Sequence, residues 1–340
     1  MRIAYDVTPL SHPRTGVGTY ILGALGGMVA AAEGEHELVA FGPVSIRGRP
    51  LLEAALEGLD VERRVVTVPF AHATRRAWSA ARRPVAERFV GRFDALHFTD
   101  WMFPPQRSGA RATMIHDLGP LKFPERLHPR TVRMHTANAH AAQRCDVVFT
   151  NAEFTAADIV ETLAIPRERI RVAHPGVDAA FAPVGVRHST GRPYAFTTAT
   201  AAEWRKNLDT LRAAWRQLEA DLQLLTIDEL GYVPHESLPP LYRGAEVFVY
   251  PSRFEGFGIP VVEAMACGVP TVVSSHPSLD EAAGTAAVRA DPEDPAALAA
   301  AVREAIARRD ELVPRGLEHA KRFSWLDTGR IHLQGYADAL

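Results

Sequence analysis

The chain has 340 residues, of which 47% are hydrophobic and 23% charged, and its formal net charge is −2. This length is long for one hydrophobic core and favours two domains. The near-neutral charge argues against nucleic acid as the main partner, because a duplex-binding protein normally carries a basic surplus.

The cysteines and the apolar runs indicate in which cellular compartment the protein resides. The two cysteines, Cys145 and Cys267, lie far apart in sequence and match no metal-ligand spacing, which is typical of a reducing compartment. Residues 1–10 read as a strand and a turn, without the basic start and apolar core of a signal peptide. No apolar run reaches the roughly 18 residues of a membrane span. We therefore expect a cytoplasmic protein.

Short β-rich runs alternate with helical patterns along the chain. In chain order these runs are residues 2–7, 38–41, 65–68, 94–98, 112–115, 146–150, 169–173, 194–198, 222–227, 246–251 and 271–275. Strands that alternate with helical windows predict an α/β protein whose parallel sheets carry helices on both faces.

Composition suggests where the two halves meet. The segment 182–193 holds two prolines and two glycines and has no sustained apolar period, so we place a linker at 184–193. The expected domains are then 1–183 and 194–324, followed by a C-terminal helix at 325–340 that could cross back to the first domain. Two facing α/β domains normally bind ligands between them, at the carboxyl ends of their strands.

Two glutamates stand eight positions apart in the apolar stretch FEGFGIPVVEAMACGVP (254–270). We predict a loop that contains Glu255, then a helix of about two turns that begins near Ile259 or Pro260, contains Glu263 and stops at Gly268. Such a helix start can bind an anion such as diphosphate through its free N–H groups, and glycines let a ligand approach the backbone. The alternative is that Glu263 only favours the helix dipole and that Glu255 is solvated.

The stretch 254–270 resembles the E-x7-E signature of retaining, GT-B-fold glycosyltransferases, the large family that includes bacterial mannosyl- and glucosyltransferases. Other similar segments follow the family's order: RTGVGTY (14–20), MIHDLGPLKFPE (114–125), TNAEFTAADI (150–159), HPGVD (174–178) and WRKNLDTL (204–211). The resemblance covers most of the chain. It implies an α/β fold of two Rossmann-like, doubly wound parallel-sheet domains that face a cleft, with the acceptor bound by the first and the donor by the second.

The resemblance also implies how the second domain holds its donor, a UDP-, GDP- or dTDP-linked sugar. Glu255 would bind hydroxyl groups of the donor sugar, and Glu263 would bind the ribose. Backbone groups of Phe257, Gly258 and Ile259 would lie near the diphosphate or the sugar. No separate cofactor is expected, and no metal is required, because no cluster in the sequence has metal-ligand spacing.

The remaining candidate residues carry charge or approach the donor. Lys206, helped by Arg205, would neutralise the leaving diphosphate, whereas the alternative for this pair is a solvated helix start. Gly16 and Gly18 would let a backbone loop approach phosphate, although a Gly-x-Gly pattern by itself favours a plain tight turn. His116, at the end of a strand, would orient the donor sugar, and its alternative is a structural histidine.

The leading hypothesis is therefore a metal-independent transferase that moves a sugar from a nucleotide-sugar donor to a sugar, lipid-linked or natural-product acceptor with retained anomeric configuration. The alternatives are a catalytically silent protein that binds nucleotides or sugars, a sugar-nucleotide epimerase, or a phosphorylase on the same scaffold. The phosphorylase lacks an evident pyridoxal-binding lysine motif.

The sequence departs from the family pattern near residues 228–231. Only Asp228, Glu229 and Leu230 separate the strand at 222–227 from Gly231, whereas a parallel crossover needs about a dozen residues or more. One βαβ unit is therefore missing, either because the second domain is reduced or because the chain skips a segment.

Residues 72–92 hold six arginines and one glutamate. A basic helix there could make a weak peripheral contact with an anionic membrane. The alternative is a helix buried on Trp78, Val85 and Phe89 with a solvated arginine face.

Overall fold

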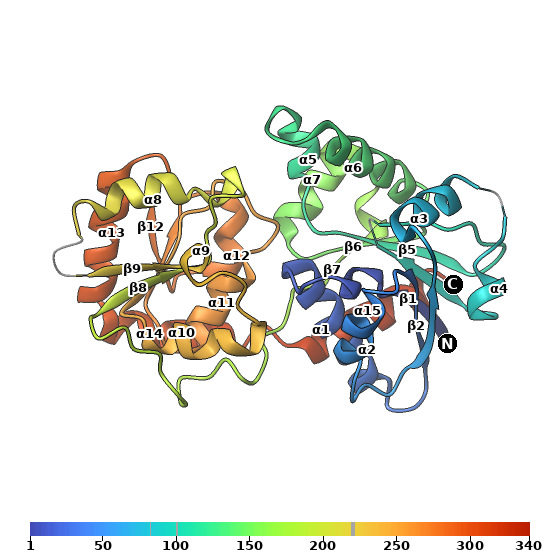
Figure 1. Ribbon diagram of the computed structural model, residues 1–340, viewed down its shortest axis with the longest axis horizontal. Coiled ribbons are helices and arrows are strands. Elements are labelled where there is room, and N and C mark those ends of the chain that lie inside the picture. Colours follow the sequence, from blue (N-terminus) through green and yellow to red (C-terminus); the bar gives the residue numbers. More distant parts are fainter. Residues whose placement is uncertain (82, 100, 219–221) are drawn as a thin grey trace. The chain divides into compact units, whose positions relative to one another are not determined.

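The computed structural model describes residues 1–81, 83–99, 101–218 and 222–340 (Figure 1). Its internal contacts divide the chain into two units. The first unit comprises Met1–Gly176 and Trp325–Leu340, and the second comprises Val177–Ser324. The first unit thus ends before residue 183, and the segment expected as a linker lies within the second unit.

Arg243 explains why the segment after residue 177 belongs to the second unit. This arginine donates hydrogen bonds from Nε to the carbonyl of Val186 (2.8 Å) and from Nη1 to the carbonyls of Ala180 (3.2 Å) and Ala182 (3.1 Å). One guanidinium has five N–H donors, so a single side chain can fix three carbonyls of an otherwise irregular segment.

The first unit is built on a seven-stranded parallel sheet with the order β3-β2-β1-β4-β5-β6-β7. Its strands are β1 (Arg2–Asp6), β2 (Glu37–Val44), β3 (Glu62–Thr67), β4 (Ala95–Phe98), β5 (Ala110–Ile115), β6 (Val147–Thr150) and β7 (Ile170–Val172). The strand order reverses between β1 and β4, which is where open α/β sheets bind their ligands.

Helices cover both faces of this sheet (Figure 1). They are α1 (Gly16–Ala32), α2 (Arg49–Ala55), α3 (Ala71–Ala80), α4 (Glu87–Val90), α5 (Gly119–Lys122), α6 (Pro129–Ala142), α7 (Glu153–Leu163) and α15 (Trp325–Asp338), with 3-10 turns η1 (Thr8–Ser11), η2 (Pro124–Arg126) and η3 (Arg167–Arg169). Neighbouring residues on β1 enter different cores, because successive side chains on a strand point to opposite faces. Ile3 and Tyr5 pack in the core that contains α1 and α15 residues, and Ala4 packs in the other.

Helix α15 returns to the first unit and packs directly on α1. Two glycines make this possible, because a Cβ at Gly27 would lie 1.8 Å from the carbonyl oxygen of Trp325, and one at Gly329 would lie 2.1 Å from the backbone of Gly27. The helix backbones therefore touch where no side chain fits.

Gly329→Ala should lower the free energy of unfolding by about 3 kcal/mol or more, because overpacking forces the two helices apart. The matched control is Gly26→Ala on α1, where a Cβ would meet only Leu59 at an ordinary 3.7 Å. That control should be neutral or slightly stabilising, since alanine favours the helix. Urea unfolding of the two variants measures the difference, and equal stabilities would show that α15 does not depend on this contact.

The second unit contains a five-stranded parallel sheet with the order β12-β11-β10-β8-β9. Its strands are β8 (Tyr194–Thr197), β9 (Gln223–Thr226), β10 (Val247–Tyr250), β11 (Thr271–Ser274) and β12 (Val288–Ala290). Its helices are α8 (Leu208–Trp215), α9 (Ile227–Leu230), α10 (Leu238–Gly244), α11 (Ile259–Ala266), α12 (Asp280–Ala283), α13 (Pro295–Ala307) and α14 (Arg309–Ala320), with η4 (Trp204–Lys206), η5 (His235–Ser237) and η6 (Pro277–Leu279). The two units are thus both Rossmann-like, as the resemblance implied.

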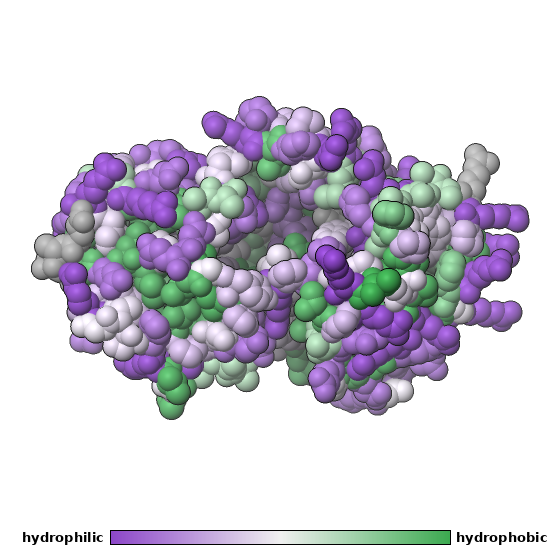
Figure 2. Space-filling view, viewed as in Figure 1, coloured by the Kyte–Doolittle hydropathy of each residue, from purple (hydrophilic) through white to green (hydrophobic). Residues whose placement is uncertain are grey.

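The shortened connection at 228–231 leaves β9 as the edge of this sheet. A single-turn helix, α9, follows β9 directly, and the chain reaches β10 through η5 and α10 without adding a strand. Thr226 caps the N-terminus of α9 in a reciprocal capping box with Glu229, so the start of this short helix is fixed by local hydrogen bonds. Hydrophobic surface gathers over β9 and α9 in Figure 2, where Leu230 remains 37% exposed.

The single basic helix considered for residues 72–92 is wrong. The structure has two short helices there, α3 and α4, with Pro84 between them. Proline has no backbone N–H and clashes with the preceding turn, which interrupts a helix. Phe89 is 41% exposed rather than buried, and Arg82 lies outside the described residues. Among the helices that are described, none has the length and apolar character to cross a bilayer.

Candidate active site

The chemistry-bearing residues of the second unit meet where its strand order reverses. Strands β8 and β10 are parallel neighbours, and the chain leaves their carboxyl ends in different directions, toward β9 and toward β11. The loop after β8 leads into η4, which contains Lys206, and the loop after β10 contains Glu255. This is the position at which doubly wound sheets bind ligands.

Lys206 and Glu255 form a largely buried ion pair. The Lys206 Nζ donates to Oε1 of Glu255 at 2.8 Å and to the hydroxyl oxygen of Tyr250 at 2.6 Å. Their side chains are only 14% and 7% exposed. Arg205 adds a second positive charge, with Nη1 at 3.8 Å from Oε2 of Glu255.

Asn207 holds the backbone that presents Lys206. It adopts a left-handed conformation (φ 58°), for which asparagine is well suited, and it is 2% exposed. Its Nδ2 donates to the carbonyl oxygens of Pro251 (3.0 Å) and Pro292 (2.6 Å). The loops after β8 and β10 are therefore fixed to one another by this amide.

The pair keeps both of its charges at neutral pH. Burial alone would raise the pKa of Glu255, but Lys206 and Arg205 outweigh burial and hold this pKa below its ordinary value. Burial alone would lower the pKa of Lys206, but the Glu255 carboxylate together with Tyr250 and Glu203 outweighs burial and raises this pKa. The site therefore presents a fixed cation next to a fixed carboxylate.

Helix α11 begins beside this pair, as predicted. It runs from Ile259 to Ala266, and Gly258 precedes it with a left-handed φ of 99°. A side chain at Gly258 would also meet Leu279 at 2.6 Å, so both conformation and space require glycine. The backbone N–H of Glu255 donates to Oγ of Ser278 (3.0 Å), which fixes the loop before the helix.

Glu263 lies in the second turn of α11 and is 4% exposed. Its Oε1 lies 2.8 Å from Nε2 of His235, and its Oε2 accepts a hydrogen bond from the hydroxyl of Tyr242 at 3.1 Å. Each carboxylate oxygen has a further lone pair, so a ligand hydroxyl can still bind. Glu263 is thus a positioned acceptor, and the reading in which it merely favours the helix dipole does not account for these two partners.

Three candidates belong to the first unit. Gly16 and Gly18 form the first turn of α1, not a free loop, and Oγ1 of Thr15 caps this turn by accepting from the N–H of Gly18 at 3.4 Å. A side chain at Gly16 would meet nothing within 4 Å, so packing alone does not require glycine there.

His116 follows β5 and packs edge-on against Tyr20, with ring centroids 5.2 Å apart. Burial is the main cause that lowers its pKa to about 4, so the imidazole is neutral at pH 7. A neutral imidazole can either donate or accept a hydrogen bond at each nitrogen, which suits an orienting role.

Two buried histidines, His97 and His332, pack against Tyr5, with ring centroids 4.6 and 6.4 Å away, and they should make the first unit sensitive to acid. Burial lowers the pKa of His332 to about 3 and that of His97 well below its usual 6.5. Because these histidines bind protons more readily in the unfolded chain than in the folded one, their contribution to stability is fully present above about pH 6.5 and is lost progressively as pH falls toward their lowered pKa values.

We therefore expect the free energy of unfolding to fall steadily between pH 6.5 and 4, and His332→Asn should make this slope shallower. The control is His140→Asn on the exposed face of α6, which should leave the slope as it is. Urea unfolding at a series of pH values measures both. A slope unchanged in His332→Asn would show that this histidine is not held neutral by the fold.

Sequence reasoning missed the residues that surround the two glutamates. Two of these residues, His235 and Tyr242, contact the Glu263 carboxylate. Tyr250 contacts Lys206, and Ser278 accepts a hydrogen bond from the backbone N–H of Glu255. None of the four belongs to a sequence motif that would mark it as a site residue. The available signal was position: His235 follows the segment GYVP, and Tyr250 ends the strand before Glu255.

Comparison with known proteins identifies relatives of both units. Residues 15–181 match the family described as Glycosyltransferase Family 4, and residues 209–308 match the family described as Glycosyl transferases group 1. O-antigen chain mannosyltransferase B of Escherichia coli is 29% identical over 378 aligned positions, which cover 96% of each chain.

Solved structures show the same fold at lower sequence identity. Sucrose-phosphate synthase from Thermosynechococcus elongatus superimposes with a TM-score of 0.73 and 18% identity, over 99% of this chain and 98% of that one. The Anabaena protein HepE, solved in complex with UDP-glucose, gives a TM-score of 0.66 and 14% identity over the whole of both chains. The two family matches together span most of the chain and follow its two Rossmann-like units, so this protein belongs to the GT-B-fold glycosyltransferases.

Proposed function

We propose that this protein transfers a sugar from a nucleotide-sugar donor to an acceptor hydroxyl, with retention of anomeric configuration and without a metal ion. The observation that carries the proposal is the buried Lys206–Glu255 pair beside the start of α11. A positive charge held at a helix N-terminus can stabilise a departing diphosphate.

Each candidate residue of the loop after β10 and of helix α11 then has a role in binding the donor. Glu255 accepts hydrogen bonds from hydroxyl groups of the sugar, and Glu263 accepts them from the ribose. Backbone groups of Phe257, Gly258 and Ile259 lie along the diphosphate. Glu255 remains ionised because of its cationic neighbours, so it binds sugar hydroxyls as a charged acceptor, which strengthens the hydrogen bonds.

The proposed reaction is a displacement on the face of the sugar from which the phosphate leaves. The bond between the anomeric carbon and the phosphate oxygen breaks, and a bond from the acceptor oxygen forms on the same face through an oxocarbenium-like state. The leaving phosphate takes the acceptor's proton. Lys206 and Arg205 stabilise the charge that develops on the diphosphate, so a metal ion is not needed for that purpose.

The relatives suggest which donors to try first. The Escherichia coli relative is named as a mannosyltransferase, and the Anabaena structure contains UDP-glucose. A thermal-shift panel should therefore begin with mannose and glucose linked to UDP, GDP and dTDP. The acceptor is a sugar, a lipid-linked sugar or a natural product, and simple sugars serve as the first acceptors in the assay.

The test is the anomeric configuration of the product, read from its proton NMR coupling, with and without EDTA. We expect the configuration of the donor to be kept and the rate to be unchanged by EDTA. An inverted product or a trapped covalent glycosyl-enzyme would contradict the displacement, and loss of rate in EDTA would contradict metal independence. Donor binding without any turnover would instead support a catalytically silent protein.

A further inference from the structure

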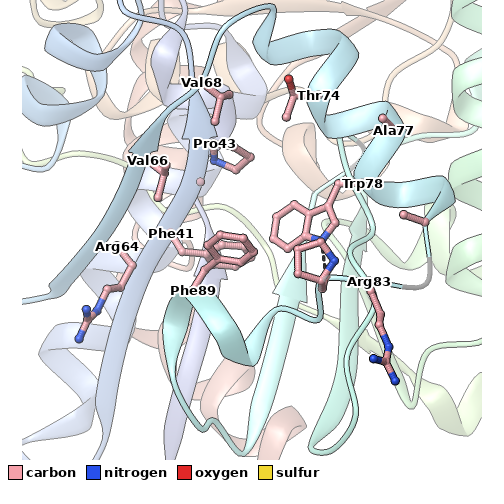
Figure 3. Close-up of a pocket in the computed structure, with 13 residues that line it drawn as sticks. Phe41, Pro43, Arg64, Val66, Val68, Thr74, Ala77, Trp78, Arg83 and Phe89 are labelled. Atoms are coloured by element: carbon pink, nitrogen blue, oxygen red, sulfur yellow. Dashed lines mark hydrogen bonds between the residues drawn. The ribbon is translucent and has the colours of Figure 1, made fainter.

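The first unit contains a cavity of about 410 Å³ between the sheet edge and the two helices that follow β3. Its wall is formed by β2 and β3 on one side and by α3, α4 and the segment between them on the other (Figure 3). It is lined by Phe41, Gly42, Pro43, Arg64, Val66, Val68, Thr74, Ala77, Trp78, Ala81, Arg83, Pro84 and Phe89. This size is within the roughly 300–1,000 Å³ typical of small-molecule sites.

The cavity is held open by specific contacts. Trp78 donates a hydrogen bond from its indole nitrogen to the carbonyl of Pro84 (2.6 Å), which ties α3 to the segment before α4. The Trp78 ring also packs edge-on against Phe89, with centroids 5.3 Å apart. Helix α3 lines the cavity with Thr74, Ala77 and Trp78, and the small side chain of Ala77 leaves space next to the Trp78 ring.

The chemistry of the wall is apolar, with two cations. Aliphatic and aromatic side chains make up most of the lining, and its two charged members are Arg64 and Arg83. The Nε of Arg64 already donates to the carboxylate of Glu62, so Arg83 is the cation that an anionic ligand can meet. In Figure 3 the two arginines are drawn on opposite sides of the cavity, with their guanidinium groups directed away from the aromatic side chains of Phe41, Trp78 and Phe89. Val66 and Phe89 keep 42% and 41% of their surface exposed, which is unfavourable in water unless a ligand covers them.

We propose that this cavity binds the hydrocarbon chain of an anionic amphiphile, such as a lipid phosphate, with its charged head beside Arg83. Apolar walls match the chain, and the planar guanidinium of Arg83 matches a phosphate or carboxylate by charge and by hydrogen-bond geometry. The cavity is lined by residues of the first unit, and none of them is a candidate residue of the donor site. The inference therefore holds whether or not the proposed function does.

A series of alkyl phosphates of increasing chain length, used below their micelle concentrations, tests the proposal by titration calorimetry. Each methylene that enters the cavity should raise affinity by about fourfold, and the gain should stop at the length that fills it. One molecule should bind per chain. A gain that continues at every added carbon, or no binding of any member, would overturn the proposal.

Three variants separate the parts of the site. Ala77→Phe fills the cavity from an exposed helix position and should abolish binding. Arg83→Glu should weaken the alkyl phosphate at least tenfold but leave binding of the uncharged alcohol of the same chain length unchanged. The matched charge control, Arg76→Glu, lies on α3 outside the lining and should change alkyl phosphate binding less than threefold. Equal losses in Arg83→Glu and Arg76→Glu would reduce the effect to general electrostatics and overturn the site.

Vesicles show where the amphiphile comes from. Phe70, before α3, is 87% exposed, and Phe70→Ser alters this surface without touching the cavity lining. If bilayer lipid is the source, phosphatidylglycerol vesicles should bind the protein, and both Ala77→Phe and Phe70→Ser should weaken that binding. If the source is a soluble amphiphile, only monomeric alkyl phosphate should bind, and Phe70→Ser should have no effect. Vesicle binding that persists in Ala77→Phe, together with no monomer binding, would contradict the cavity as the site.

Discussion

Lys206→Ala should lower kcat for sugar transfer by roughly 10²–10³-fold, the cost typical of removing one group that stabilises developing charge. Lys206 is the cation held closest to the Glu255 carboxylate, at 2.8 Å, and it also binds Tyr250. Its loss leaves the buried Glu255 carboxylate without its main partner, so we also expect a lower melting temperature. Steady-state kinetics at saturating donor, on protein shown to be folded by circular dichroism, measures the effect.

Two further variants distinguish catalysis from stability. Lys206→Arg keeps the charge and should recover part of kcat. Lys122→Ala removes a lysine from a comparable pair, Lys122–Asp158 at 2.6 Å in the first unit, and should reduce stability without a similar loss of kcat. If Lys206→Ala keeps kcat within about threefold of wild type, the leaving group is stabilised by other residues.

Glu263→Gln should weaken the binding of the nucleoside diphosphate by about 10–100-fold, because hydrogen bonds to a charged acceptor contribute about 1.5–3 kcal/mol. The amide keeps the shape of the side chain but has one acceptor oxygen instead of two. It must also point its NH₂ group toward His235 or Tyr242, which now meet carboxylate oxygens. Titration calorimetry with UDP, GDP and dTDP measures the loss.

The control for Glu263 is Tyr242→Phe. This change removes one hydrogen bond to the carboxylate but keeps its charge, so we expect a loss of only a few-fold. In kinetics, Glu263→Gln should act mainly on KM for the donor, whereas Lys206→Ala should act mainly on kcat. Unchanged nucleotide binding in Glu263→Gln would remove this residue from the ribose site.

The local pattern of the sequence predicts most of the elements. All eleven β-rich runs correspond to strands, because short apolar, β-branched runs between turn signals are typical of buried parallel strands. Helix α13 begins at Pro295 after Asp294, whose side chain accepts from the N–H of Ala296 at 2.8 Å, as the capping pattern predicts. Strand β12 was missed, since only Val288–Ala290 pair with β11.

What sequence could not predict are the contacts made over long distances along the chain. The docking of α15 on α1 depends on Gly27 and Gly329, which are ordinary helix positions until the two helices meet. The hydrogen-bond partners of Glu263 lie in η5 and α10, which precede β10 in the chain, whereas Glu263 itself lies in α11, after β10. The sequence pattern identifies Glu255, Glu263 and Lys206 as candidates. Only the folded chain shows that Glu255 and Lys206 form an ion pair.

The apolar cavity beside β3 could not be predicted from the sequence either. Residues 72–92 look like one basic helix when read as a string, because arginines recur through it. Pro84 divides this stretch into two helices, α3 and α4. The cavity is the space between these two helices and strands β2 and β3. A pattern based on helical period alone cannot anticipate a space that results from its interruption.

The most direct test of the central claim is the release of nucleoside diphosphate from a panel of UDP-, GDP- and dTDP-sugars by the wild-type chain and by Glu255→Gln and Lys206→Ala. The wild-type chain should release nucleoside diphosphate from at least one donor, and both variants should lose at least 99% of that rate while remaining folded. Release at the wild-type rate by either variant, or no release from any donor by the wild-type chain with a range of acceptors, would contradict the claim that this site transfers sugar.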